Sequence, residues 1–317
     1  MKEPLFIGSC AALVTPFTST GVDYEKLAEL IEFHIKNKTD ALAVCATTGE
    51  APTLPDDEHK DILRFAVEKA NGRIPIIAGT GSNDTAHAVE FTKYADEIGA
   101  DGMLVVTPYY NKTTQHGLYL HMKAIAESTS KPIIVYNVPS RTGLNITIET
   151  LKKLDKIPNI NAIKEASGDI AFMARIINET DLVVYTGNDD NIVPCLSLGG
   201  NGVISVLANV IPKETHDICE KYMSGDVKAS RDLFLKYFEL ARTLFIEVNP
   251  IPVKTAMNLM GMHVGGLRLP LCDMQPENLT KLENVLKKYG LMNNICPSIS
   301  TISGPFLTYI ISTSSCQ

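Results

Sequence analysis

Residues 158–168 read Pro158-Asn159-Ile160-Asn161-Ala162-Ile163-Lys164-Glu165-Ala166-Ser167-Gly168. The apolar residues of this stretch are typical of a buried strand in a parallel sheet, with Lys164 at the strand end and Gly168 in the following turn. Burial disfavours the charged ammonium of a lysine, and a lysine amine is nucleophilic only when it is neutral. Lys164 could therefore attack a ketone to form a Schiff base. Taken alone, however, the stretch favours a lysine that reaches water or pairs with Glu165.

Short runs rich in valine and isoleucine recur along the chain and alternate with amphipathic segments. The runs predict eight strands, at 10–14, 41–45, 75–78, 102–106, 133–136, 162–164, 182–185 and 202–206. The segments between them predict helices, among them 24–38, 57–71, 84–99, 115–129 and 147–156. This alternation indicates βαβ units and a parallel sheet, which eight units can close into a β/α (TIM) barrel. An open, doubly wound sheet is the alternative, but the first strand runs into Thr15-Pro16-Phe17 and lacks a phosphate-binding glycine motif.

The pattern changes after the eighth predicted strand. Residues 211–292 hold helical segments, including 230–245, 253–260 and 277–288, and no convincing strand. We therefore expect a β/α barrel with the active site over residues 1–224 and a C-terminal helical domain over 225–292. Residues 293–317 contain no Asp, Glu, Lys or Arg and are rich in serine and threonine, which predicts a disordered tail.

Composition places the chain among soluble globular proteins. It has 317 residues, of which 45% are hydrophobic and 21% charged, and a net charge of −7. The negative charge argues against nucleic acid or an anionic membrane as a general partner. We see no secretory signal and no apolar run of the roughly 20 residues that a membrane-spanning helix needs. Seven cysteines without paired close spacing favour a reducing cytoplasm over a disulfide framework or a structural zinc.

In a β/α barrel, active sites lie where the strands end, so the strand-end segments are the candidates. Residues 46–50, Ala-Thr-Thr-Gly-Glu, could bind a carboxylate through hydroxyls and backbone amides, although Thr48 could instead cap the next helix. The two tyrosines of residues 107–112 could transfer protons or simply pack. In residues 136–143, Arg141 suits bidentate capture of a carboxylate, or a surface salt bridge.

Two classes of chemistry find no support among these segments. His116 and His121 are five residues apart and do not share one helix face, so they make a poor metal site. The seventh strand runs into Gly187-Asn188-Asp189-Asp190, whose carboxylates would repel a phosphate. The remaining set of a lysine, tyrosines, hydroxyls and an arginine is suited to amine-catalysed carbon–carbon chemistry on small keto acids, with no metal and no cofactor.

Several of these motifs together resemble a known family, the pyruvate-dependent class I aldolases of the dihydrodipicolinate synthase / N-acetylneuraminate lyase family. The resemblance runs from about residue 6 to residue 292 and rests on segments 46–50, 107–112, 136–143, 163–168, 199–206 and 249–254. Arg141 points to the synthase branch, because lyases of the family lack an arginine there. A lyase or aldolase for another 2-keto acid is the alternative, and a catalytically idle barrel that binds a small carboxylate is a third interpretation.

The resemblance implies a reaction and a role for each matched residue. Lys164 would form an imine with pyruvate, and the derived enamine would attack the aldehyde of L-aspartate 4-semialdehyde. The implied catalytic residues are Lys164, Tyr136, Thr47 and Tyr110, with Tyr110 supplied across a dimer interface. The implied substrate-binding residues are Thr48, Arg141, Gly187 and Ile204. The resemblance also implies a homotetramer made of two tight dimers.

Three positions raise questions that the sequence leaves open. Family members generally have glycine where this chain has Ala46, and alanine would be strained there if the backbone required a positive φ. Lysine-sensitive members usually have a glutamate where His87 stands, so we predict weak or absent inhibition by lysine. Lys254 is a rival nucleophile, but its place at a predicted helix start favours a structural role.

Overall fold

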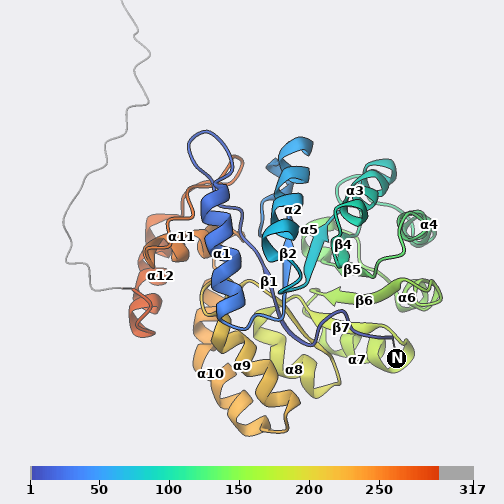
Figure 1. The fold of residues 1–317 in the computed structure, drawn as a ribbon. Coiled ribbons are helices and arrows are strands. Elements are labelled where there is room, and N and C mark those ends of the chain that lie inside the picture. Colours follow the sequence, from blue (N-terminus) through green and yellow to red (C-terminus); the bar gives the residue numbers. More distant parts are fainter. Residues whose placement is uncertain (1, 293–317) are drawn as a thin grey trace, which may run out of the picture.

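A computed structural model describes residues 2–292, in which eight parallel strands close into a barrel (Figure 1). The strands are β1 (Gly8–Ala12), β2 (Ala41–Val44), β3 (Ile76–Gly79), β4 (Gly102–Val106), β5 (Ile133–Asn137), β6 (Ile160–Glu165), β7 (Val183–Thr186) and β8 (Gly202–Ser205). Each strand pairs with its neighbour in sequence, and β1 pairs with β8 to complete the ring. The predicted TIM barrel is therefore confirmed, and the open sheet is wrong.

Helices surround the barrel (Figure 1). Those between the strands are α1 (Tyr24–Lys36), α2 (Asp56–Ala70), α3 (Thr85–Glu97), α4 (Gln115–Ala126), α5 (Pro139–Thr142), α6 (Ile148–Leu154), α7 (Ile170–Glu179) and α8 (Ile192–Ser197). Side-chain caps explain where several begin, as with Asp23, Asp84 and Asp169, each of which accepts a backbone N–H of the first turn.

The C-terminal part is helical, as predicted. It comprises α9 (Pro212–Met223), α10 (Val227–Thr243), α11 (Ile251–Leu259) and α12 (Pro276–Lys288), with no strand in 211–292. In Figure 1, α10, α11 and α12 gather at one side of the barrel, in orange to red. Leu240, Val253 and Leu282 belong to the same apolar cluster as the barrel's outer face. The division at residues 224 and 225 stays a prediction, and the predicted tail, 293–317, lies outside the described residues.

Strand residues alternate between two apolar clusters, which decides where each side chain points. Ala162, Tyr136 and Ile204 belong to the cluster inside the barrel. Ile163 and its neighbour Val135 on β5 belong to the cluster between strands and helices. Since β6 extends through residue 165, this alternation directs Lys164 into the barrel and Glu165 outward.

Predicted strand boundaries differ from the observed ones by at most two residues. The first strand begins two residues earlier than predicted, and β6 has six residues rather than three. The predictions follow runs of apolar side chains, which indicate burial. The observed strands end where backbone hydrogen bonding to the neighbouring strand ends, so the two sets of boundaries need not coincide. Within residues 2–292, no helix combines the length and apolar character required to cross a membrane.

Candidate active site

Lys164 is a buried lysine at the carboxyl end of β6, with only 5% of its surface exposed. Its Nζ lies 4.2 Å from the centroid of the Tyr136 ring. Tyr136 stands directly beside it in the sheet, since β5 and β6 pair Tyr136 with Lys164. Among residues 2–292, no ion pair joins the Lys164 amine to a carboxylate. The amine is thus held against an aromatic face inside the barrel mouth.

Glu165 faces away from Lys164, as predicted from strand alternation. Its carboxylate accepts hydrogen bonds from Asn137 Nδ2 at 2.8 Å and from the backbone N–H of Ser167 at 2.6 Å. Burial raises the pKa of this carboxyl, while the same hydrogen bonds oppose the shift. Glu165 therefore fastens the loop after β6, and the interpretation of Lys164 as its surface partner is wrong.

Two predicted site residues, Gly187 and Ile204, lie on the side of the barrel that β7 and β8 form. A Cβ added at Gly187, just after β7, would lie 2.8 Å from Lys164 Cε and 2.7 Å from Ala166 Cβ. Only glycine leaves room there for the lysine side chain. Ile204 on β8 is fully buried in the barrel interior and lines it from the opposite side of β7.

The segment after β2 carries Thr47 and Thr48. Thr48 is buried, and its Oγ1 accepts a hydrogen bond from Asn249 Nδ2 at 3.0 Å. The capping role for Thr48 is wrong, because the next α-helix begins only at Asp56. Within the described chain, Ala46 is not among the residues with positive φ, and Cys45 takes φ 54° instead. The strain considered for alanine at position 46 therefore does not arise.

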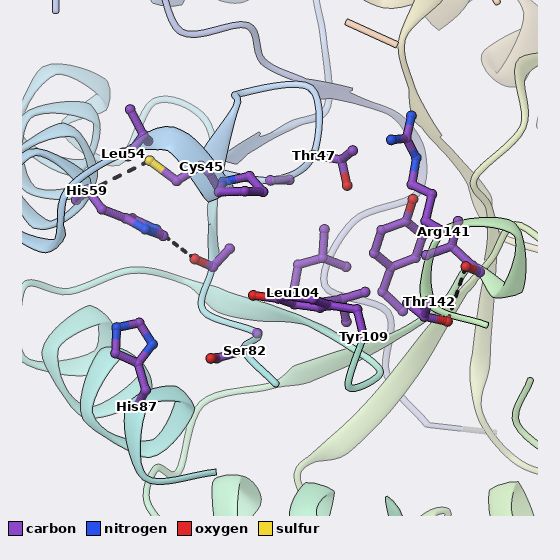
Figure 2. A pocket seen from close by; sticks show the side chains of 18 of the residues that line it. Cys45, Thr47, Leu54, His59, Ser82, His87, Leu104, Tyr109, Arg141 and Thr142 are labelled. Atoms are coloured by element: carbon purple, nitrogen blue, oxygen red, sulfur yellow. Dashed lines mark hydrogen bonds between the residues drawn. The ribbon is translucent and has the colours of Figure 1, made fainter. Parts of the chain in front are cut away.

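A cavity of about 390 Å³ opens at this end of the barrel. Thr47, Tyr136 and Arg141 line it, and Figure 2 shows Thr47 and Arg141 on one side. Lys164 does not line the cavity itself, but its amine lies against the Tyr136 ring, which does. The cavity therefore brings together a possible acid–base group, a hydroxyl and a guanidinium next to the buried amine.

Arg141 lies on α5, a single helical turn that follows β5. Its Nη2 donates to the backbone carbonyl of Asn249 at 3.0 Å. The rest of the guanidinium is exposed toward the cavity, where it can meet a carboxylate. Asn249 thus contacts both Thr48 and Arg141.

Of the predicted site residues, Thr47, Tyr136 and Arg141 line this cavity, whereas Lys164, Thr48, Gly187 and Ile204 do not. Tyr110 does not line it either, and it points into solvent. It is 92% exposed and takes φ 67°, whereas the preceding Tyr109 lines the cavity. A tyrosine this exposed has its ring available to a second molecule.

The far side of the cavity holds two histidines, seen opposite Thr47 and Arg141 in Figure 2. His87 Nε2 lies 3.2 Å from Asp56 Oδ1. His59 Nε2 lies 2.9 Å from the Gly79 carbonyl, and burial lowers the pKa of His59 to about 4. The imidazole of His59 is therefore neutral near pH 7.

Lys254 is structural, as predicted. Only 1% of its surface is exposed, and its Nζ lies 2.8 Å from Glu50 Oε1. The ammonium also donates to the backbone carbonyls of Thr15, at 2.9 Å, and Gly266, at 2.5 Å. All three N–H donors are thus engaged, and none remains for attack on a substrate.

Sequence reasoning missed two polar residues near the site. The sequence indicates only that Asp189 would repel a phosphate, but Asp189 is 2% exposed and accepts hydrogen bonds from Ser205 Oγ at 2.5 Å and from the backbone N–H groups of Val206 and Leu207. It fixes the end of β8. Asn249 lies within segment 249–254, which supported the family resemblance, but no local pattern indicated its contacts.

A TIM barrel with a buried lysine at the end of β6 and an arginine-lined cavity defines an enzyme of the Schiff-base lyase class. The sequence profile of the Dihydrodipicolinate synthetase family matches residues 5–289, and the chain belongs to that family. It is 58% identical over 291 residues to a 4-hydroxy-tetrahydrodipicolinate synthase of Clostridium perfringens, covering 91% of this chain and all of that protein.

Solved structures agree with this membership. The dihydrodipicolinate synthase of Aquifex aeolicus is 48% identical and superposes with a TM-score of 0.89, over 91% of this chain and 100% of that one. A structure described as the first monomeric dihydrodipicolinate synthase variant is 43% identical with a TM-score of 0.88, over 91% of this chain and 98% of that one. The family resemblance seen in the motifs is thereby confirmed.

Proposed function

We propose that this chain condenses pyruvate with L-aspartate 4-semialdehyde to 4-hydroxy-tetrahydrodipicolinate, in the biosynthesis of diaminopimelate and lysine. The high identity to named synthases over nearly the whole fold supports the reaction. Arg141 supports the semialdehyde over other aldehydes, since its guanidinium faces the cavity and suits a second carboxylate.

Lys164 is the nucleophile in this proposal. Its amine attacks C2 of pyruvate, and loss of water gives the imine. Loss of a C3 proton converts the imine to an enamine, whose C3 forms a bond to the aldehyde carbon of the semialdehyde. The amino group of the semialdehyde then attacks the imine carbon, which closes the ring and releases the Lys164 amine.

The remaining residues move protons and hold the substrates. Tyr136, in contact with the amine, is the acid–base group, and Thr47 links it to Tyr110. Thr48 binds the carboxylate of pyruvate and Arg141 that of the semialdehyde. The remaining substrate-binding residues are Gly187 and Ile204, which line the pyruvate pocket.

The exposure of Tyr110 fits a homotetramer of two tight dimers, in which each Tyr110 completes the partner's proton relay. A monomeric form would leave the relay without its third group. We place the enzyme in the cytoplasm, where its biosynthetic substrates are made.

One observation carries the proposal: the amine of Lys164 is buried against the Tyr136 ring without a carboxylate partner among the described residues. Lys164 and Lys254 are the two buried lysines of residues 2–292 that could act as the nucleophile. The amine of Lys254 is already bound by three acceptors, which leaves Lys164.

Borohydride reduction in the presence of pyruvate, followed by peptide mapping, tests it. We expect one pyruvyl adduct, on Lys164, and none in Lys164→Met. An adduct on Lys254, or none in the wild-type protein, would refute the mechanism. Turnover assays with several aldehydes then test the substrate, and a preference for an aldehyde without a carboxylate would favour another aldolase of the family.

A further inference from the structure

Asn249 connects the two groups proposed to bind the substrate carboxylates. It lies two residues before the start of α11, and it is 201 residues from Thr48 and 108 residues from Arg141 in the sequence. Its side-chain Nδ2 donates to Thr48 Oγ1 at 3.0 Å, and its backbone carbonyl accepts from Arg141 Nη2 at 3.0 Å. The two contacts use separate parts of one residue, so a side-chain change removes the first and spares the second.

The direction of the Thr48 bond matters for chemistry. A threonine hydroxyl has one proton and two lone pairs, and here the Asn249 amide occupies a lone pair. The hydroxyl proton must then point elsewhere, and no group among residues 2–292 accepts it in a hydrogen bond. A carboxylate has only acceptors, so a hydroxyl held in this orientation is a ready donor to it.

The side-chain oxygen of Asn249 also supports a role beyond folding. Asn249 is 5% exposed, and its Oδ1 is buried without a hydrogen-bond partner among the described residues. Leaving a buried acceptor unsatisfied destabilises a fold. An amide kept for packing or stability alone would be expected to satisfy both of its polar atoms.

We propose that Asn249 is a positioning residue, which fixes the Thr48 hydroxyl as a hydrogen-bond donor to the carboxylate of the keto-acid substrate. The inference rests on the proposed function, because it assumes that Thr48 binds this carboxylate. It also assigns a part in substrate binding to the C-terminal helical region, which supplies Asn249.

The experiment measures the pyruvate concentration that half-saturates borohydride trapping, together with KM for each substrate. We expect Asn249→Ala to raise the pyruvate half-saturation by up to about tenfold, because the Thr48 hydroxyl is no longer held in the donating orientation and its hydrogen bond to the charged carboxylate weakens. KM for the semialdehyde stays within about twofold, since the carbonyl that holds Arg141 remains.

The Asn249→Asp variant distinguishes a positioning role of Asn249 from a purely structural role. Aspartate has nearly the same shape and still bonds Thr48, but it accepts the hydroxyl proton instead of donating to the oxygen. A purely structural role predicts that Asp is tolerated better than Ala. The positioning role predicts the reverse order, with weaker pyruvate binding in Asn249→Asp than in Asn249→Ala.

Two further variants complete the design. Asn258→Ala is the matched control, because it removes two hydrogen bonds in the same region, to Gly265 and Val264, without contacting Thr48. It should trap pyruvate as the wild type does. Thr48→Val combined with Asn249→Ala should bind pyruvate no more weakly than Thr48→Val alone, since both changes remove one interaction.

Any of three results would overturn the inference. The first is a wild-type pyruvate half-saturation in Asn249→Ala, and the second is tighter pyruvate binding in Asn249→Asp than in Asn249→Ala. The third is additive effects of the two changes in the double variant. Failure of the proposed function looks different, because the wild-type protein itself would then give no adduct on Lys164. Circular dichroism of each variant establishes that it is folded. Should Asn249→Ala not fold, the isosteric Asn249→Asp still decides, and unchanged pyruvate binding in it would refute the role.

Discussion

Gly187→Ala is the most direct test of how tightly the site holds its nucleophile. Gly187 does not require a positive φ, so alanine fits its backbone, and only the added Cβ perturbs the site. That Cβ would lie 2.8 Å from Lys164 Cε and 2.7 Å from Ala166 Cβ, at least 0.6 Å closer than an ordinary contact. The overlap with Lys164 Cε forces the lysine side chain to move, and the overlap with the Ala166 Cβ, which is fixed to the backbone, forces a shift of the backbone.

The magnitude follows from two effects. Overpacking a buried site costs about 1–3 kcal/mol of stability. Displacing a reacting group by ~1 Å can lower the rate by ~100-fold, because the amine no longer meets the carbonyl carbon in the attacking geometry. We therefore expect Gly187→Ala to lower kcat and the rate of borohydride trapping by roughly 10- to 100-fold.

Gly266→Ala is the control, since its added Cβ would meet nothing within 4 Å and its φ is not positive. Both proteins are assayed for pyruvate trapping, turnover and thermal unfolding. Trapping and turnover within twofold of the wild type in Gly187→Ala would refute the reasoning, because Lys164 would then tolerate displacement.

Three further predictions concern stability, pH and regulation. Lys254→Met leaves the fully buried Glu50 without its cation and should lower the free energy of unfolding by about 3–5 kcal/mol in denaturant. Lys228→Met breaks an exposed ion pair and should cost little, so equal effects of the two changes would contradict the reasoning. Burial raises the pKa of Asp189 to about 6, so its contribution to stability is present below about pH 4 and is lost as the pH rises through 6. Relative to Asp189→Asn, the wild type should lose about 2 kcal/mol between pH 4 and 7, and a pH-independent difference would reject the assignment. Lysine should inhibit the wild type weakly or not at all and His87→Glu more strongly; strong inhibition that His87→Glu leaves unchanged would count against His87 as the determinant.

The sequence alone determined the architecture. Strand and helix patterns are local, because burial of one face imposes a period of two or about 3.6 residues. Eight such units in alternation leave few topologies, and the barrel was therefore predictable. The position of Lys164 at the end of a strand, and the motifs at neighbouring strand ends, were visible for the same reason.

Boundaries and local geometry were less predictable. The alternation that directs Lys164 inward and Glu165 outward could be argued in advance, since it is a property of any strand. Whether Ala46 required a positive φ could not, because that depends on how the chain leaves β2. The structure places the left-handed residue one position earlier, at Cys45.

Only the tertiary structure decided which lysine is free to react. Lys164 and Lys254 are both buried, but the partner that engages Lys254 lies 204 residues away, at Glu50. Asn249 likewise contacts Thr48 across 201 residues. Such contacts form only when the barrel closes and the C-terminal helices pack on it, and no local sequence pattern encodes them. The sequence therefore determined the barrel and a set of candidate residues, and the packing determined which amine is unoccupied and how the Thr48 hydroxyl is oriented.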